Sequence, residues 1–76
     1  MSELLEWREH DRNSEITYTE FGPYMVEKLA ENDFRSWHPD ITKNARVMIE
    51  GFSSRKSARA SCQYDVDGRR NATEGK

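Results

Sequence analysis

The sequence contains a single cysteine, Cys62, among its 76 residues, so no disulfide can form within the chain. The two histidines, His10 and His38, are the only other thiol or imidazole ligands. No two of these three residues stand at the spacing of a zinc site, so we expect no metal and no cofactor. The four glycines are scattered, which excludes a phosphate-binding loop and a dinucleotide fingerprint. No apolar run approaches the ~18–20 residues of a membrane span. These absences favour a small cytoplasmic protein that does not bind a membrane.

Catalytic motifs are missing as well. A pair of Cys62 with His38 would be the minimum for thiol catalysis, but Cys62 falls on the apolar side of an alternating segment, where a cysteine usually acts as a small hydrophobe. The serines carry no nucleophile-elbow motif, and a chain of 76 residues leaves little room for a pocket beside a stable core. We therefore predict no enzyme activity, no catalytic residue and no small-molecule substrate.

Charge is plentiful and unevenly placed. Residues 1–40 hold ten acidic and four basic side chains, and residues 41–76 hold four acidic and eight basic ones, which gives the halves charges of −6 and +4. Such asymmetry is typical of proteins that bind a polyanion or an acidic partner. The alternative is that the two halves neutralise each other within the fold.

Residues 40–52 carry the densest apolar pattern. Asp40 suits a helix N-cap and Gly51 suits the position just after a helix. A strand is the alternative, because Val47 and Ile49 are β-branched and alternate with other side chains. The pattern favours the helix, because the apolar side chains fall at the spacing of one helical stripe: Ile41, Ala45, Met48, Ile49 and Phe52.

Four further segments carry a readable pattern. Residues 15–20 alternate β-branched or aromatic side chains with polar ones and predict a strand. Residues 23–33 have an apolar side at helical spacing and predict a helix. Residues 58–66 alternate small apolar with polar side chains and predict another strand. Residues 2–13 predict a short helix, with a strand at 5–7 as the alternative.

These elements indicate an α+β fold. We expect one small compact domain over residues 1–66, with a two- or three-stranded antiparallel sheet packed against two or three short helices. If residues 40–52 form a strand, it would pair with residues 58–66 as a hairpin. Residues 67–76 begin with a turn dipeptide and are polar, so we expect a disordered tail.

The favoured functional hypothesis is a small regulatory module that binds nucleic acid through a basic surface in residues 43–70. It requires that the cations of this segment gather on one outward surface without carboxylates beside them. The pI of about 5.6 argues against it, since many nucleic-acid modules have a pI above ~9. The side chains that would contact phosphate are Lys43, Arg46, Arg55, Lys56, Arg59, Arg69 and Arg70.

The alternative hypothesis is a protein–protein interaction module, an adaptor or inhibitor, that docks through the acidic N-terminal half and exposed aromatic side chains. Its candidate anchors are Trp7, Tyr24 and Trp37, because large aromatic side chains dominate interface energetics. In so small a domain such side chains more often lie in the core. Both hypotheses describe a binding module without catalysis.

Overall fold

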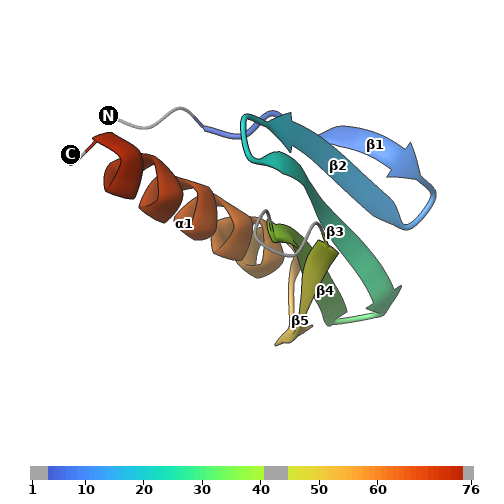
Figure 1. Ribbon diagram of the computed structural model, residues 1–76. Coiled ribbons are helices and arrows are strands. Elements are labelled where there is room, and N and C mark those ends of the chain that lie inside the picture. The colour runs from blue at the N-terminus through green and yellow to red at the C-terminus, as the bar shows by residue number, and fades with distance from the viewer. Residues whose placement is uncertain (1–3, 41–44, 75–76) are drawn as a thin grey trace.

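The computed structural model describes residues 4–40 and 45–74, which form one antiparallel sheet and one long helix (Figure 1). The expected sheet of two or three strands against two or three helices is wrong. The sheet has five strands, and one helix follows it in the described part of the chain. The elements are β1 Arg8–Asp11, β2 Ser14–Thr19, β3 Gly22–Ala30, β4 Asp33–Asp40, β5 Ala45–Phe52 and α1 Arg55–Glu74.

Each strand pairs with the next one along the chain, in the order β1-β2-β3-β4-β5. Short turns make this meander possible. Between β1 and β2 the Asp11 carboxylate accepts the Asn13 backbone N–H at 2.8 Å, a side-chain bond that closes such turns. Between β3 and β4, Asn32 adopts a φ of 59°, which asparagine tolerates better than most residues. Gly22 has a φ of 120°. A Cβ added at this position would lie 3.1 Å from the Cβ of Pro39, so this turn favours glycine.

The strand predicted over residues 15–20 is confirmed by β2, but the helix predicted over 23–33 is wrong, because most of that segment forms β3. Tyr24 and Val26 are buried on the face beneath α1, and Met25 points to the other face because side chains alternate along a strand. A strand with apolar side chains on both faces produces adjacent and four-apart apolar positions, which also describe a helix.

The helix predicted over residues 40–52 is also wrong. Residues 45–52 form the edge strand β5, the alternative interpretation, while 41–44 lie outside the described residues. β5 pairs with β4 and not with residues 58–66. Gly51, with a φ of 96°, lies in a bulge where β5 has one residue more than β4. At the other end of the chain, residues 4–7 have no regular structure and β1 stands in place of the helix predicted over 2–13.

The strand predicted over residues 58–66 lies within α1 and is wrong. Every second member of its alternating apolar set, namely Ala58, Cys62 and Val66, has no exposed surface. Residues four apart share one helix face, so this subset forms the buried stripe of α1. Tyr64 belongs to the same alternation but is 84 % exposed. The apolar spacing of two residues in the sequence therefore hid the spacing of four residues that marks the buried side of the helix.

α1 begins at a serine cap and runs into the segment that was expected to be disordered. Ser54 caps the start, since its Oγ accepts the Ser57 backbone N–H at 3.1 Å. The helix runs to Glu74, so residues 67–74, expected as part of a disordered tail, are helical.

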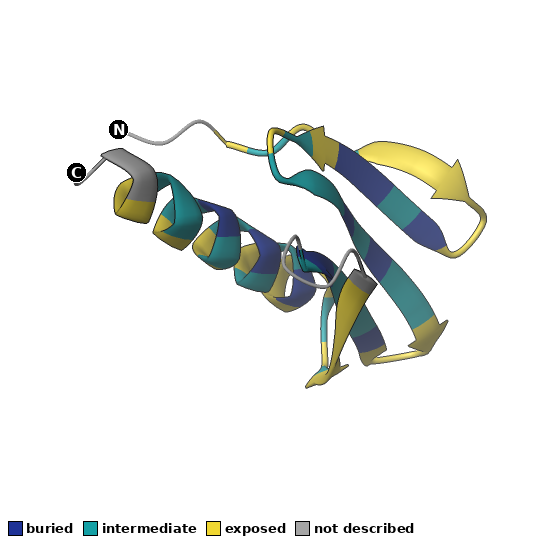
Figure 2. Cartoon of the chain, in the orientation of Figure 1, coloured by how far each residue is buried: buried dark blue, intermediate teal, exposed yellow. Residues whose placement is uncertain are grey.

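α1 covers one face of the sheet and lies mainly over β3 and β4 (Figure 2). Its buried stripe meets Tyr24, Val26 and Phe34 to form the core. The fold is thus two layers, and no helix or strand of the described chain lies over the other sheet face, which we call the open face, although Ser14 and Ile16 of β2 point to it and are buried. The core is completed at its margins by Leu5, Trp7, Phe21 and Phe52.

Candidate functional site

A chain of polar side chains runs beneath α1. Tyr24 donates its hydroxyl hydrogen to Asp65 Oδ2 at 2.6 Å, and Asp65 Oδ1 lies 3.7 Å from His38 Nδ1. His38 Nε2 is in turn hydrogen-bonded to Ser36 Oγ at 3.1 Å. This serine–histidine–aspartate order resembles a hydrolase triad, but Ser36 has no exposed surface. A substrate does not reach it in this structure, so the chain is best explained as a buried hydrogen-bond network that ties α1 to β3 and β4.

Burial favours the neutral forms of His38, Cys62 and Tyr24. It lowers the pKa of His38 below its usual 6.5, although Asp65 partly opposes the shift. It raises the pKa of the Cys62 thiol to about 12 and, together with Asp65, raises that of Tyr24. Cys62 is buried, as the sequence predicted, although on a helix. A protonated thiol without access is not a nucleophile, and the described residues contain no His, Cys, Asp and Glu cluster that could hold a metal.

Several of the basic residues proposed for nucleic acid are paired with carboxylates. Arg55 and Arg59, near the start of α1, share one carboxylate: Glu15 Oε1 lies 3.2 Å from Arg55 Nε and 3.0 Å from Arg59 Nε. Near the other end of α1, Arg69 Nε lies 2.9 Å from Asp65 Oδ2. At 1.5 Å per residue along the helix axis, Arg69 lies about 15 Å from Arg59 and about 21 Å from Arg55.

The remaining proposed cations that the structure describes are partly paired with carboxylates and partly exposed. Arg70 binds Glu20 through two hydrogen bonds of 2.8 and 3.0 Å, and these bonds hold the pKa of Glu20 at about 2. Arg46 on β5 and Lys56 on α1 are exposed and form no ion pair within the described residues. Lys43 lies outside the described residues. Four of the seven proposed cations are thus neutralised by carboxylates of the same chain.

The three aromatic residues proposed as anchors have different surroundings. Tyr24 has no exposed surface and serves the core. Trp7 is half-buried at the margin of the core, with Arg59 Cζ 6.0 Å from its ring centroid. Trp37 is half-buried and points to the open face, because its neighbour His38 points beneath α1. Of the three, Trp37 is the one placed on an uncovered sheet face.

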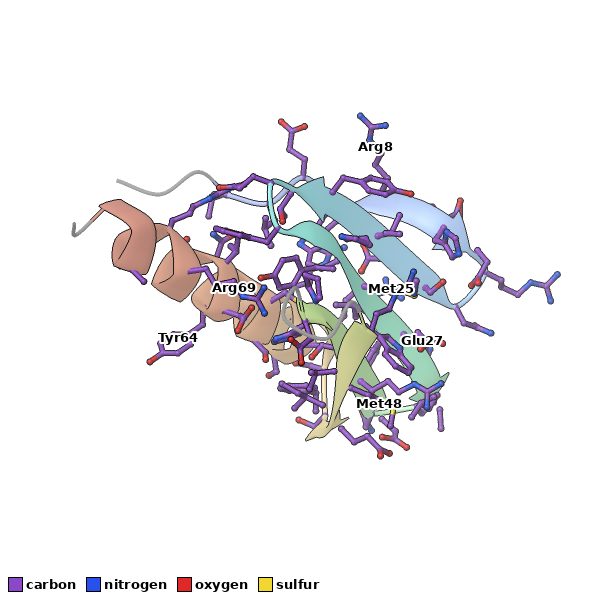
Figure 3. The ribbon with its side chains drawn as sticks, in the orientation of Figure 1. Arg8, Met25, Glu27, Met48, Tyr64 and Arg69 are labelled. Atoms are coloured by element: carbon purple, nitrogen blue, oxygen red, sulfur yellow. The ribbon has the colours of Figure 1, made fainter. Side chains whose placement is uncertain are left out.

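Trp37 belongs to a row of side chains that crosses all five strands. Directly paired positions run from Arg8 on β1 to Ile16, then to Met25, Trp37 and finally Met48 on β5. Directly opposite residues share a face, so these five side chains form one line, which we call the open-face row. Figure 3 shows Met25 and Met48 on the sheet and Tyr64 and Arg69 on α1. The centre of the row is apolar and one end is a cation.

Trp37 is held in place by polar neighbours. Its Nε1–H donates to Glu27 Oε1, and Arg35 Nε donates to the same oxygen at 3.0 Å. Arg35 Cζ also lies 5.4 Å from the Trp37 ring centroid, within cation–π range. Burial alone would raise the pKa of Glu27, but the two donors outweigh it and lower that pKa. The indole is therefore held in one orientation by its neighbours.

A hollow of about 500 Å³ adjoins the Arg8 end of the open-face row. It is open to solvent and mixes charged with apolar walls. Among its walls, Leu4 is 82 % and Tyr18 is 70 % exposed. Its lining residues are Leu4, Leu5, Glu6, Arg8, Thr17, Tyr18 and Arg70.

Met25 and Met48 were missed as site residues because both fell in segments predicted as helices. The sequence does hold one signal of a strand. Glu27 follows Met25 at the strand spacing of two, and both alternate with Tyr24 and Val26, which would lie on the opposite face. Without the register of the sheet, however, nothing in the sequence aligns Met25 with Trp37 or Met48.

No protein-family model, no curated protein and no solved structure matches this chain significantly. Within the described residues, α1 lacks the length of apolar sequence that would let a helix cross a bilayer.

Proposed function

We propose that this protein is a small, non-enzymatic regulatory module that binds another protein through the open face of its sheet. The observation that carries the proposal is the open-face row, in which Met25, Trp37 and Met48 lie side by side without a covering layer in the described chain. Contiguous apolar surface of this kind marks interaction sites, and methionine and tryptophan are enriched in interface centres. The free, buried Cys62 suits a reducing compartment, and we place the function in the cytoplasm.

The row also sets the chemistry of the partner. Arg8, at its β1 end, is exposed and forms no ion pair within residues 4–40 and 45–74. Glu27, the carboxylate beside Trp37, is already bound by Arg35. The surface thus complements a partner segment that is apolar along its length and carries a carboxylate at one end. The hollow beside Arg8 would receive that acidic side chain.

A protein partner accounts for the charges better than a nucleic acid does. Nucleic-acid affinity comes from cations that neutralise phosphates and release counterions. Here Glu15 binds both Arg55 and Arg59, and a phosphate would have to displace that carboxylate. Nucleic-acid binding through the basic set remains the competing prediction, and the experiment below includes it.

The test is capture of a partner from extract of the source cells by the tagged protein, with and without nuclease. Arg8→Glu reverses the charge at the end of the row, and Met25→Ser removes an apolar side chain from its middle. Arg12→Glu is the matched control, because Arg12 is also exposed and without an ion pair in the described chain but lies in the turn after β1.

We expect one defined protein to be recovered by the wild type and by Arg12→Glu, and to be lost with Arg8→Glu and Met25→Ser, whether or not nuclease is present. Equal recovery by all four proteins would contradict the proposal. Gel retardation of duplex DNA and single-stranded RNA at low salt tests the competing prediction. Retardation that falls steeply with added salt and is lost with Arg46→Glu/Lys56→Glu would favour nucleic acid instead.

A further inference from the structure

The edge strand β5 is long and apolar at its centre, and its one bulge, between Ile49 and Phe52, lies near its end. It is the last strand of the sheet, so its outer backbone groups face no strand of the described chain. The opposite edge, β1, has four residues, all exposed and polar, and short, charged edges resist pairing. β5 has eight residues and contains neither proline nor lysine. A long apolar edge is a template for another strand.

Both faces of β5 carry apolar side chains. Met48 lies beside Trp37 on the open face, and Val47 and Ile49 point to the α1 side by alternation. Val47 is 46 %, Met48 38 % and Ile49 38 % exposed, and most of the strand is drawn as exposed in Figure 2. α1 lies mainly over β3 and β4, so it does not complete the burial of these side chains.

The sequence from Arg46 to Glu50 is complementary to itself. When two copies of it run antiparallel about Met48, each Arg46 lies opposite the Glu50 of the other copy. Each Val47 then lies opposite an Ile49. Cross-strand pairs of opposite charge and of β-branched residues stabilise a sheet. A shift of one residue would place open-face side chains of one copy beside α1-side side chains of the other. It would also separate each Arg46 from the opposite Glu50, so the charges favour the same register.

We propose that β5 pairs with the β5 of a second copy of this chain, antiparallel and centred on Met48. The two sheets then join into one, with both α1 helices on the same side. Such an interface uses the same surface on both copies, so it closes at the dimer and does not extend into a fibre. The bulge at Gly51 ends the paired segment. This dimer does not depend on the proposed partner binding, although it would join the two open-face rows at Met48.

The dimer is tested by sedimentation equilibrium of the full chain over a wide range of concentration. Arg46→Glu places two glutamates opposite each other at both ends of the pairing, and Glu50→Arg places two arginines there. Like charges directly opposite destabilise a sheet, so each variant should raise the dimer dissociation constant roughly tenfold or more. Both positions are exposed, so the monomer should keep its fold. Arg12→Glu, at the far edge of the sheet, is the control and should dimerise as the wild type does.

The decisive measurement is an equimolar mixture of Arg46→Glu with Glu50→Arg. In a mixed dimer every opposing pair is again of opposite charge, so association should return to about the wild-type level. A wild type that stays monomeric at its highest soluble concentration overturns the proposal. So does a dimer that ignores both charge reversals, or a mixture that fails to restore association. Arg8 and Met25 lie outside this interface, so a failure here is separate from a failure of partner binding.

Discussion

The hydrogen bond from Tyr24 to Asp65 should be a measurable part of the stability. Tyr24 has no exposed surface, and its hydroxyl is 2.6 Å from Asp65 Oδ2. Tyr24→Phe removes that donor and keeps the ring in the core. Hydrogen bonds to charged groups contribute about 1.5–3 kcal/mol. Asp65 keeps Arg69 at 2.9 Å, so its charge is not left alone, and we expect a loss near 2 kcal/mol.

This loss should be visible as a change in Tm. In a domain of this size each 1 kcal/mol lowers Tm by roughly 4–8 °C, so Tyr24→Phe should lower Tm by roughly 10 °C. The assay is urea and thermal unfolding followed by circular dichroism. Tyr64→Phe is the matched control, because Tyr64 lies on the outer side of α1 and is 84 % exposed. It should leave the free energy of unfolding unchanged. Equal stability of the two variants would refute the role assigned to the buried network.

Three further predictions concern the same core. Val66→Ala should cost about 2–3 kcal/mol by lost burial and the cavity left behind, whereas Val47→Ala at the exposed edge should cost well under half of that; urea unfolding measures both. Stability should fall as pH rises from 9.0 towards 12, because the unfolded chain releases the Cys62 proton at 9.0 and the folded chain only at about 12. Cys62→Ala should reduce this alkaline decline, and what remains should come from Tyr24. Stability should also fall as pH drops below 6.5, because His38 is protonated more readily in the unfolded chain than in the folded chain. An NMR titration of the His38 imidazole should show a midpoint below 6.5, and a midpoint above 6.5 would contradict this prediction.

Part of the fold follows from local pattern. β2 was predicted because its composition and its alternation agree, with Ile16 and Tyr18 on one face and Thr17 and Thr19 on the other. β3 and β5 were missed for a common reason. Each places apolar side chains on both faces, since one face meets or borders α1 and the other is the open face. The spacing-of-two signal is lost when both faces are apolar.

α1 was missed for the opposite reason. Its segment alternates perfectly, yet only Ala58, Cys62 and Val66 reach the core. Which half of an alternating set is buried depends on what packs against it, and that information lies in β3 and β4 rather than in the segment itself.

The candidate site shows the same limit. Trp37 was identified from residue type alone, because large aromatics are frequent anchors. Its neighbours in the open-face row come from other strands, and the register that aligns them depends on turns at Asn13, Gly22 and Asn32. Likewise, the carboxylates that bind Arg59 and Arg70 are 44 and 50 residues away in sequence, so no local pattern indicates those ion pairs.

The meander order has a consequence for how the chain reaches its native state. Every strand pairs with its neighbour in sequence, so hairpins can zip up one after another without closing a long loop. Among the elements of the described chain, α1 follows all five strands in sequence, so it leaves the ribosome after them, and until it docks both sides of the nascent sheet face water. During that interval the bare sheet is a target for chaperones and for other nascent chains, and the arrival of the helix ends its exposure on one side.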